Sequence, residues 1–315
     1  MKVVIAGYGS IGKRHLRSFL RVRPNYEYAL LRRSSSLSSE VPEHVRQLTS
    51  VAETKHLAPD LLCICTPSQQ HREDIEKLVP ATKHLFVEKP LITAVHQAKD
   101  CLGALSGLEG MFFYGCVMRF LPVVEALREL ARSTLYGRVL SYHCECGSYL
   151  PEWRAGADYR TLYAASAQSG GVALDLIHEF DYPQWCFGPI ASLNGVRAKV
   201  SALEIASEDL CCAVAEHSTG VRGTISLNYY QRKTTRTCAV VCEGANVHAD
   251  LLTGRLSIEL PGKPAIWREL GIDRDRQFDV QSQRMFETIE RGETSPWDAR
   301  EAVMLIERVL NLPKH

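Results

Sequence analysis

Residues 1–12 read MKVVIAGYGSIG and carry the strongest structural signal in the chain. Apolar β-forming residues at positions 3–5 lead directly into glycines spaced G-x-G-x-x-G, at Gly7, Gly9 and Gly12. A buried strand that turns through such glycines into a helix is the arrangement that holds the pyrophosphate of a dinucleotide. The stretch therefore predicts a dinucleotide-binding site, with a glycine turn of another α/β protein as the alternative.

Each of the three glycines has its own physical task in this arrangement. Gly7 permits the tight turn, Gly9 lets the backbone approach the phosphates, and Gly12 lets the helix pack closely on the strand. A helix-like stretch follows at 13–20, and a helix N-terminus offers N–H groups and a positive dipole end to an anion. We expect cofactor contacts from Gly7, Gly9, Ser10, Ile11 and Gly12.

Length and composition are those of an ordinary globular protein of about two domains. Of the 315 residues, 45% are hydrophobic and 23% are charged, and the formal net charge is +1, so no global field points to nucleic acid or membrane. No apolar run reaches the ~18 residues of a membrane span, and the first strand begins at once, which leaves no room for a signal peptide. We expect a cytoplasmic protein without nucleic-acid or membrane partners.

The eleven cysteines form neither a disulfide nor a metal-binding pattern. Cys63 and Cys65, like Cys144 and Cys146, are two residues apart, which places each pair on one face of a strand. No C-x-x-C occurs, no His/Cys cluster has zinc spacing, and a reducing compartment argues against disulfides. We interpret the cysteines as small buried hydrophobic residues and predict no metal site.

Residues 1–118 alternate between strand-like and helix-like segments. This alternation implies a parallel, doubly wound sheet, and therefore an N-terminal Rossmann domain of the α/β class. We expect strands over 2–6, 27–31, 60–65, 84–87 and 111–116, with helices over 71–79 and 93–105.

Two short segments follow strands of this sheet. Thr66-Pro67 comes after one buried strand, and Glu88-Lys89-Pro90 comes after the next. Ligands bind doubly wound sheets beyond the carboxyl ends of the strands, which meet at one edge. We therefore expect the glycine loop to line one crevice together with Thr66, Pro67, Glu88 and Lys89.

Residues 119–315 read as an α+β domain with a large, mostly antiparallel sheet. Long β-rich segments follow one another, and Ser218-Thr219-Gly220 between two of them is typical of a hairpin turn. The domain boundary is predicted near Arg119. The β-rich segments cover 138–149, 193–200, 209–217, 222–231 and 237–243, and helices are expected over 123–132 and 298–310.

The end of the second strand bears on the choice of cofactor. An NAD site usually carries Asp or Glu about 20 residues past the glycines, on the ribose 2′-hydroxyl. Arg32, Arg33 and Ser34 occupy this place, and a guanidinium suits a phosphate because its planar fork donates paired hydrogen bonds. We expect NADP in preference to NAD; the alternative is that the two arginines are solvated charges.

Five motifs, taken in order, give the chain a family resemblance. They are the glycine motif, CTPSQQH at 65–71, EKP at 88–90, MRFLP at 118–122 and GGVALDLIHEFD at 170–181. Together they span nearly the whole chain and resemble the Gfo/Idh/MocA oxidoreductases, NAD(P)-dependent enzymes that act mostly on sugars and cyclitols. The resemblance adds His71 to the expected cofactor-binding residues.

The resemblance also implies catalytic roles. Lys89 corresponds to a lysine beside the nicotinamide and the reacting hydroxyl, where an ammonium stabilises negative charge on oxygen; the alternative is a surface lysine. His178 corresponds to the proton acceptor or donor, which imidazole suits near neutral pH; the alternative is a core histidine. Asp175 precedes it on the same helical face by three residues instead of the commoner four, and Asp181 is a competing partner.

The segment 147–160 combines aromatic rings with hydrogen-bonding groups, which suits the recognition of sugars. It is similar to a subgroup of the family associated with cell-surface polysaccharide and nonulosonate-type sugar pathways. The alternative for Arg154 and Asp158 is a structural ion pair, and an anionic group on the sugar would meet Arg154 and Arg160. The expected substrate-binding residues are Arg119, Trp153, Arg154, Asp158, Tyr159 and His178.

These features predict an NADP- or NAD-dependent oxidoreductase. It would transfer a hydride between nicotinamide and a secondary alcohol or ketone of a sugar, nucleotide sugar or cyclitol. The alternatives are a glycoside-cleaving enzyme that uses NAD in an internal redox cycle and a non-catalytic dinucleotide-binding sensor. An antiparallel sheet with one uncovered face predicts a homo-dimer or homo-tetramer.

Overall fold

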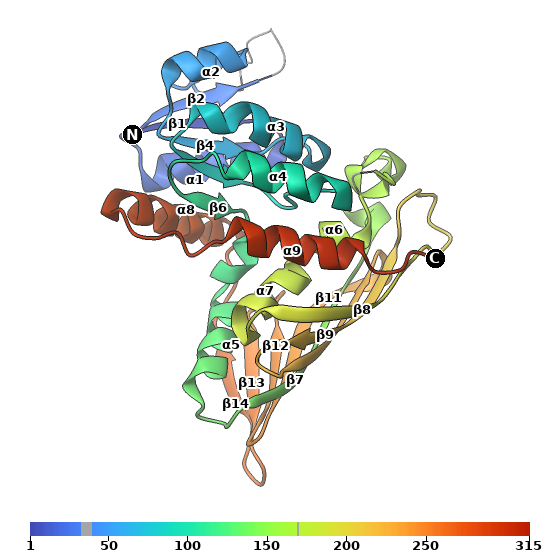
Figure 1. Cartoon of the computed structure of the whole chain (residues 1–315). Helices are drawn as coiled ribbons and strands as arrows, with labels where there is room; N and C mark the ends of the chain where they lie inside the picture. The colour runs from blue at the N-terminus through green and yellow to red at the C-terminus, as the bar shows by residue number, and fades with distance from the viewer. Residues whose placement is uncertain (33–39, 169) are drawn as a thin grey trace. The chain divides into compact units, whose positions relative to one another are not determined.

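The chain folds into two compact units, each with its own sheet (Figure 1). The computed structural model describes residues 1–32, 40–168 and 170–315. Unit 1 contains residues 1–117 and 274–304, and unit 2 contains residues 118–273 and 305–315.

The second segment of unit 1 differs from the sequence prediction, which places all of 119–315 in one domain. The long helix α8 (Arg274–Arg291) packs against helix α1 (Ser10–Val22). Its Met285 and Phe286 are buried in the same hydrophobic cluster as Val3 and Phe19. Unit 1 is therefore completed by a helix from far along the sequence, a contact that local patterns do not reveal.

Unit 1 is built on a six-stranded sheet whose neighbouring strands are all parallel. Its strands are β1 Lys2–Ala6, β2 Glu27–Leu31, β3 Arg46–Leu48, β4 Leu61–Ile64, β5 His84–Val87 and β6 Phe112–Tyr114. The order β3-β2-β1-β4-β5-β6 reverses between β1 and β4, and ligands bind such sheets at this switch point. The predicted doubly wound sheet is confirmed.

Helices pack against this sheet and bury its central strands completely. β4 and β5 are buried at every position, as parallel strands between helical layers are. β3 and α2 are not anticipated from the sequence because both are too short to show a clear periodicity. Besides α1 and α8, the helices are α2 Val51–Leu57, α3 His71–Leu78 and α4 Ala98–Leu105.

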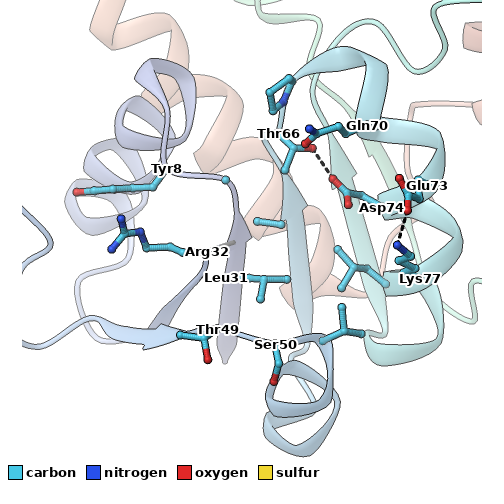
Figure 2. A pocket seen from close by; sticks show the side chains of 15 residues that line it. Tyr8, Leu31, Arg32, Thr49, Ser50, Thr66, Gln70, Glu73, Asp74 and Lys77 are labelled. Atoms are coloured by element: carbon cyan, nitrogen blue, oxygen red, sulfur yellow. Dashed lines mark hydrogen bonds and ion pairs between the residues drawn. The ribbon is translucent and has the colours of Figure 1, made fainter. Parts of the chain in front are cut away.

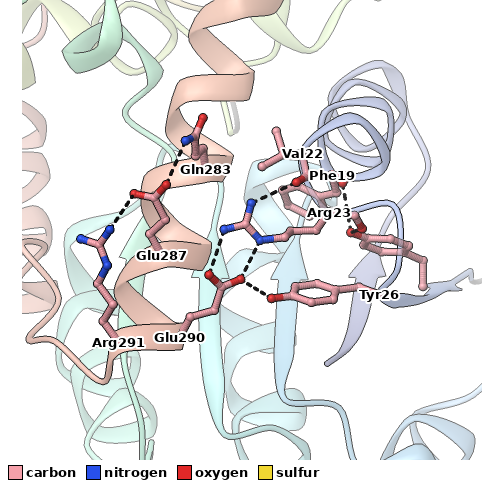
Figure 3. Close-up of polar contacts among 9 residues, drawn as sticks. Phe19, Val22, Arg23, Tyr26, Gln283, Glu287, Glu290 and Arg291 are labelled. Atoms are coloured by element: carbon pink, nitrogen blue, oxygen red, sulfur yellow. Dashed lines mark hydrogen bonds and ion pairs between the residues drawn. The ribbon is translucent and has the colours of Figure 1, made fainter.

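An ion pair fastens α8 to the end of α1 (Figure 3). Arg23 donates two hydrogen bonds to Glu290, from Nε at 2.6 Å and from Nη2 at 2.9 Å, and Tyr26 donates a third. The hydrogen bonds from Arg23 lower the pKa of Glu290 to about 2. An unfolded glutamate titrates near a pKa of about 4.3, so this stabilisation is present above that pH and is lost as the pH falls towards 2.

Glu290→Gln is therefore expected to lower the free energy of unfolding at pH 7 by about 1 kcal/mol. This value is the upper end of the contributions measured for solvent-exposed ion pairs. The difference from the wild type should shrink between pH 4 and pH 2, which chemical denaturation at several pH values measures. Glu109→Gln, at an exposed position of the same unit, is the matched control. Equal effects of both substitutions would contradict the prediction.

Unit 2 is built on an eight-stranded sheet. Its strands are β7 Val139–Tyr149, β8 Ile190–Ala198, β9 Leu210–His217, β10 Arg222–Asn228, β11 Tyr230–Cys242, β12 Asn246–Asp250, β13 Arg255–Glu259 and β14 Ile266–Glu269. The order is β14-β13-β12-β11-β7-β10-β9-β8, with only the described pair β10–β7 parallel. The predicted, mostly antiparallel sheet is confirmed, and Ser218–Gly220 lies in the hairpin between β9 and β10.

Helices of unit 2 cover one face of this sheet. They are α5 Pro122–Ser133, α6 Val172–Asp175 and α7 His178–Phe187. Phe187 stacks on Tyr142 of β7, and Tyr182 donates a hydrogen bond to Cys144 of the same strand. Alternate residues of β7, such as His143, therefore point to the opposite face.

The final helix α9 (Ala299–Leu310) contains the division between the units, which falls after Met304.

All eleven cysteines are free, and ten of them are buried, with Cys212 half-buried. This agrees with their interpretation as small hydrophobic residues. Within the described ranges, no helix is long and apolar enough to cross a membrane.

Candidate active site

The glycine loop lies between β1 and α1 in unit 1, with the geometry that each glycine requires. Gly7 has φ +95°, and a Cβ there would lie 2.8 Å from the Cys65 carbonyl oxygen. A Cβ at Gly12 would lie 2.1 Å from the Gly7 carbonyl oxygen. Both positions are therefore closed to any side chain by the protein itself.

Gly9 differs from the other two glycines because it faces open space. A Cβ at Gly9 would have no described atom within 4 Å. Gly9 is also the N-cap of α1, which begins at Ser10, and helix N-termini present unsatisfied N–H groups. This cradle at the switch point fits an anionic pyrophosphate, which a side chain at Gly9 would displace.

A pocket of about 470 Å³ adjoins the glycine loop in unit 1 (Figure 2). This volume is in the range of small-molecule sites. Figure 2 shows Tyr8 and Arg32 on one side of the pocket and Thr66 and Asp74 on the other. The residues that line it include Gly7, Tyr8, Leu31, Arg32, Thr49, Ser50, Thr66, Pro67 and Gln70.

The charges in this pocket bear on the choice of cofactor. Arg32 lies at the end of β2 and donates a hydrogen bond from Nη1 to Gln47 at 3.0 Å. Of the acidic residues that line the pocket, Asp74 accepts a hydrogen bond from Thr66 at 2.6 Å, and Glu73 pairs with Lys77. Arg33 and Ser34, also predicted to contact the cofactor, lie outside the described residues.

A buried histidine contacts the segment 88–90 that follows β5. His15 of α1 shares a hydrogen bond of 2.6 Å with Glu88, and both side chains are buried. The backbone N–H of Lys89 donates to the other carboxylate oxygen of Glu88 at 3.2 Å. Glu88 therefore supports the segment from inside, whereas the side chain of Lys89 is half-buried.

His71 lies beneath two strand-end loops at once. Its Nδ1 is 2.7 Å from the Pro90 carbonyl oxygen and its Nε2 is 2.8 Å from the Thr66 carbonyl oxygen. Burial lowers the pKa of His71, while the two carbonyl contacts act in the opposite direction. The ring therefore lies between the carbonyls of both loops, and a neutral imidazole donates to one of them. The expected contact of His71 with the cofactor stays a prediction.

In unit 2, Asp175 and His178 do not share one helix, which corrects the sequence prediction. α6 ends at Asp175, Leu176 leaves the helical region with φ −95° and ψ 28°, and α7 begins at His178. Asp175 is buried and accepts hydrogen bonds from the hydroxyls of Tyr163 and Tyr229, the latter at 3.3 Å. His178 is also buried.

Asp181, the competing partner of His178, forms an ion pair with Arg119. Arg119 donates to the two carboxylate oxygens of Asp181, from Nε at 2.8 Å and from Nη2 at 2.5 Å. Asp181 is buried and the Arg119 side chain nearly so. No local sequence pattern indicates this bidentate pairing of Arg119 with Asp181. The expected contact of Arg119 with the substrate stays a prediction.

The loop that follows β7 is held by contacts within the loop and by a contact with Tyr229. Trp153 donates from Nε1 to Ser148 at 2.9 Å and packs edge-on against Tyr229 with ring centroids 5.2 Å apart. Asp158 forms its ion pair with Arg160 at 2.8 Å, so the alternative of a pair with Arg154 is wrong.

The remaining predicted substrate residues differ in exposure. The Tyr159 hydroxyl accepts a hydrogen bond from the Glu204 backbone N–H at 3.2 Å, and Arg154 is exposed.

Sequence reasoning missed Tyr163 and Tyr229 because no spacing rule connects either one to Asp175. The only available signal was their aromatic, hydroxyl-bearing side chain.

Comparisons with known proteins agree with this geometry. A model of the oxidoreductase family with an NAD-binding Rossmann fold matches residues 1–115, and a model of the Gfo/Idh/MocA C-terminal domain matches residues 124–248. The chain belongs to the Gfo/Idh/MocA oxidoreductase family, as the sequence motifs indicate.

Individual relatives match over part of their length. The chain is 28% identical over 131 residues to 2,7-anhydro-N-acetylneuraminate hydratase of Escherichia coli K12, covering 42% of this chain and 34% of the relative. It is 29% identical over 132 residues to inositol 2-dehydrogenase of Rhizobium meliloti, covering 41% and 37%. The matched stretch thus spans about a third of these relatives. A levoglucosan dehydrogenase complex with NADH shares the fold, with TM-score 0.86, 16% identity and coverage of 98% and 95%.

Proposed function

We propose that the protein is a nicotinamide-dependent oxidoreductase that interconverts a secondary alcohol and a ketone on a sugar-like substrate. The observation that carries this proposal is the open cradle at Gly9 beside the pocket of about 470 Å³. Lys89 follows the parallel strand β5, which is separated from β1 by β4, at the carboxyl edge of the same sheet. Family membership supports an oxidoreductase.

Two side chains are proposed to handle the reacting oxygen and its proton. The Lys89 ammonium donates a hydrogen bond to the substrate oxygen and stabilises negative charge on it. The His178 imidazole accepts the hydroxyl proton during oxidation and returns it during reduction. The nicotinamide, when bound, supplies the hydride chemistry, while the protein fixes orientation and excludes water.

The substrate class is proposed from the loop after β7 and from the relatives. Ring faces such as that of Trp153 and directed polar groups suit polyhydroxylated rings. The names of the matched relatives refer to a sialic acid derivative and a cyclitol. Incubation of the whole chain with oxidised nicotinamide and a panel of sugars, nucleotide sugars and cyclitols tests the proposal through the absorbance of reduced nicotinamide.

One relative favours a second candidate function. The name of the Escherichia coli relative denotes a hydratase, a net reaction without redox change. An enzyme of this kind would use the bound dinucleotide in an internal cycle that returns it to its starting state. Product formation without a lasting absorbance change favours this candidate, whereas cofactor binding without any product favours a non-catalytic sensor.

NADP is proposed as the preferred cofactor because Arg32 lines the pocket at the end of β2. The guanidinium pairs with a 2′-phosphate through parallel hydrogen bonds, whereas NAD offers only a neutral hydroxyl. Titration monitored by calorimetry is expected to give a dissociation constant about tenfold lower for NADP than for NAD, the worth of one charge-assisted contact. Tighter binding of NAD would overturn this preference.

A homo-oligomer formed through the unit 2 sheet is also proposed. On the face away from α7, Val214, Thr224, His143 and Ala239 lie side by side across four strands. Val214 is exposed. Exposed apolar side chains on a sheet face are typical of subunit contacts, so this exposure supports the proposal. Sedimentation velocity of the intact chain distinguishes a dimer or tetramer from a monomer.

We also propose that the protein lies in the cytoplasm, because free thiols such as those of its cysteines persist in a reducing compartment.

A further inference from the structure

A buried ion pair joins the first turn of α7 to the sheet of unit 2. Glu179 of this helix is fully buried, and Arg236 of β11 donates from Nε to its Oε1 at 2.7 Å. Nη2 of Arg236 lies 2.5 Å from the same oxygen. The second oxygen of Glu179, Oε2, is buried and has no hydrogen-bond partner among the described residues. Arg236 is therefore the described group that compensates this buried carboxylate.

The register of the sheet explains why Arg236 meets α7. β11 pairs with β7 so that Arg236 lies opposite Cys146. Cys144, two residues earlier on β7, accepts a hydrogen bond from Tyr182 of α7, so Cys146 and Arg236 lie on the face that this helix covers. Burial alone would lower the pKa of Arg236, but the Glu179 carboxylate raises it, so the guanidinium stays charged.

The same turn carries His178, the residue proposed to exchange a proton with the substrate. His178 begins α7 and directly precedes Glu179. Leu176 leaves the helical region, and the N-cap residue Ile177 makes no side-chain cap. His178 therefore lies at the start of a helix, where the backbone has fewer helical hydrogen bonds than in its middle. The contact of Glu179 with Arg236 ties this turn to β11.

The energetics of buried ion pairs argue that this one does more than stabilise the fold. The cost of removing two charges from water is comparable to their attraction, so apolar side chains of similar volume are often equally stable at such positions. A charged pair adds geometry, because the planar guanidinium fixes the direction from which a carboxylate can approach. Beside His178, such a fixed direction bears on the position of the imidazole.

We propose that Glu179 and Arg236 are positioning residues for His178. Arg236 holds the Glu179 carboxylate at a fixed point on β11, and the adjoining backbone transmits this constraint to His178. The imidazole is thereby kept within reach of the hydroxyl proton that it accepts during oxidation and returns during reduction. This role rests on the proposed function.

The test replaces the ion pair by apolar side chains of similar size in the whole chain. Glu179→Leu combined with Arg236→Met should keep the melting temperature of the wild type or raise it. Turnover at saturating cofactor and sugar should fall about a hundredfold, the loss expected when a catalytic group is displaced by ~1 Å. KM for the sugar and the dissociation constant of the cofactor should stay at their wild-type values.

Two single variants of Arg236 show whether the contact itself carries the effect. Arg236→Met leaves Glu179 buried without a counter-charge, so it should lower the melting temperature as well as the turnover. Arg236→Lys keeps the charge but meets the carboxylate with one ammonium in place of the planar fork. Its turnover should lie about tenfold above that of Arg236→Met, the worth of one charge-assisted hydrogen bond, and below that of the wild type.

A matched control makes the same two substitutions at another ion pair of the unit 2 sheet. Arg255 of β13 donates from Nε to Glu269 of β14 at 2.8 Å, and both side chains are exposed. Glu269→Leu combined with Arg255→Met should leave turnover and melting temperature near their wild-type values, because exposed ion pairs contribute little. A loss of turnover confined to the pair at 179 and 236 then belongs to its place beside His178.

The outcomes separate this proposal from the proposed function. Wild-type turnover in the Glu179→Leu, Arg236→Met variant overturns the positioning role while the oxidoreductase proposal stands. A fall in turnover that comes with a matching loss of cofactor affinity also overturns it, because the pair then supports the fold at large. Should the double variant fail to fold, Arg236→Lys decides: wild-type turnover overturns the role, and lower turnover at the wild-type KM supports it. A wild type that turns over no member of the sugar panel overturns the proposed function, and this inference with it.

Discussion

Replacement of Lys89 by methionine is expected to lower turnover about a thousandfold, a loss typical of one electrostatic group at a reacting oxygen. Methionine keeps a similar unbranched length but carries no charge and donates no hydrogen bond. The oxygen of the substrate would then lose the group that stabilises negative charge on it. Steady-state rates at saturating cofactor and sugar measure the loss.

The dissociation constant of the cofactor should change little in the same variant. Part of the support of this segment does not involve the Lys89 side chain: the Lys89 backbone N–H donates to Glu88, and Glu88 is held by His15. These contacts survive the substitution, so the glycine loop and the pocket beside it should keep their shape. A large loss of cofactor affinity would show that the lysine binds the dinucleotide and does not act on the substrate.

The other lysine near β5 provides a matched control. Lys83 is exposed and lies one residue before the strand begins, whereas Lys89 lies two residues after it ends. Lys83→Met should leave turnover and cofactor affinity unchanged, because the amino edge of a doubly wound sheet does not bind ligands. A Lys89→Met variant that retained a substantial fraction of wild-type turnover would remove the lysine from the mechanism.

The parts of the structure that sequence reasoning predicts are those set by short-range rules. The strand before Gly7 and the strand-end positions of Thr66 and Lys89 follow from apolar runs, turns and the geometry of parallel sheets. The positive φ of Gly7 and the contact of Gly12 with the Gly7 carbonyl are equally local, because both lie within the turn itself. Each of these predictions needs knowledge of only a few neighbouring residues.

The parts that sequence reasoning misses depend on contacts between distant residues. Spacing alone places Asp175 and His178 on one helical face, yet Asp175 is bonded by Tyr163 and Tyr229 and the helix breaks at Leu176. The packing of α8 against α1 likewise brings together residues more than 250 positions apart, as the Arg21–Asp279 pair shows. Periodicity carries no information on such pairs.

Gly12→Ala and Gly9→Ala are expected to separate folding from cofactor binding. At Gly12 the new methyl would lie 2.1 Å from the Gly7 carbonyl oxygen, so the turn or the helix must shift. Overpacking of this kind should lower the free energy of unfolding by about 3 kcal/mol. At Gly9 the methyl meets no described atom within 4 Å, so the loss should stay below about 1 kcal/mol, as for a weakened N-cap.

Cofactor binding should fail in both variants for different reasons. In Gly12→Ala the loop itself is displaced, whereas in Gly9→Ala the methyl occupies the space through which the pyrophosphate approaches the N-terminus of α1. Denaturation without cofactor measures the free energy of unfolding of each variant. Calorimetric titration with NADP measures the dissociation constant of the cofactor for each variant. Gly103→Ala, in α4 with no described atom within 4 Å of its Cβ, should instead add about 1 kcal/mol of stability through helix propensity.

The contrast between Gly9 and Gly12 decides what the glycine motif does in this chain. If Gly9→Ala bound NADP as tightly as the wild type while Gly12→Ala unfolded, the motif would be a packing device with no ligand at its open side. If Gly9→Ala keeps its stability and loses the cofactor, the open cradle is the pyrophosphate site. The three glycines in the sequence alone are compatible with a packing role and with a pyrophosphate site. Only the space around a Cβ at each position distinguishes the two roles.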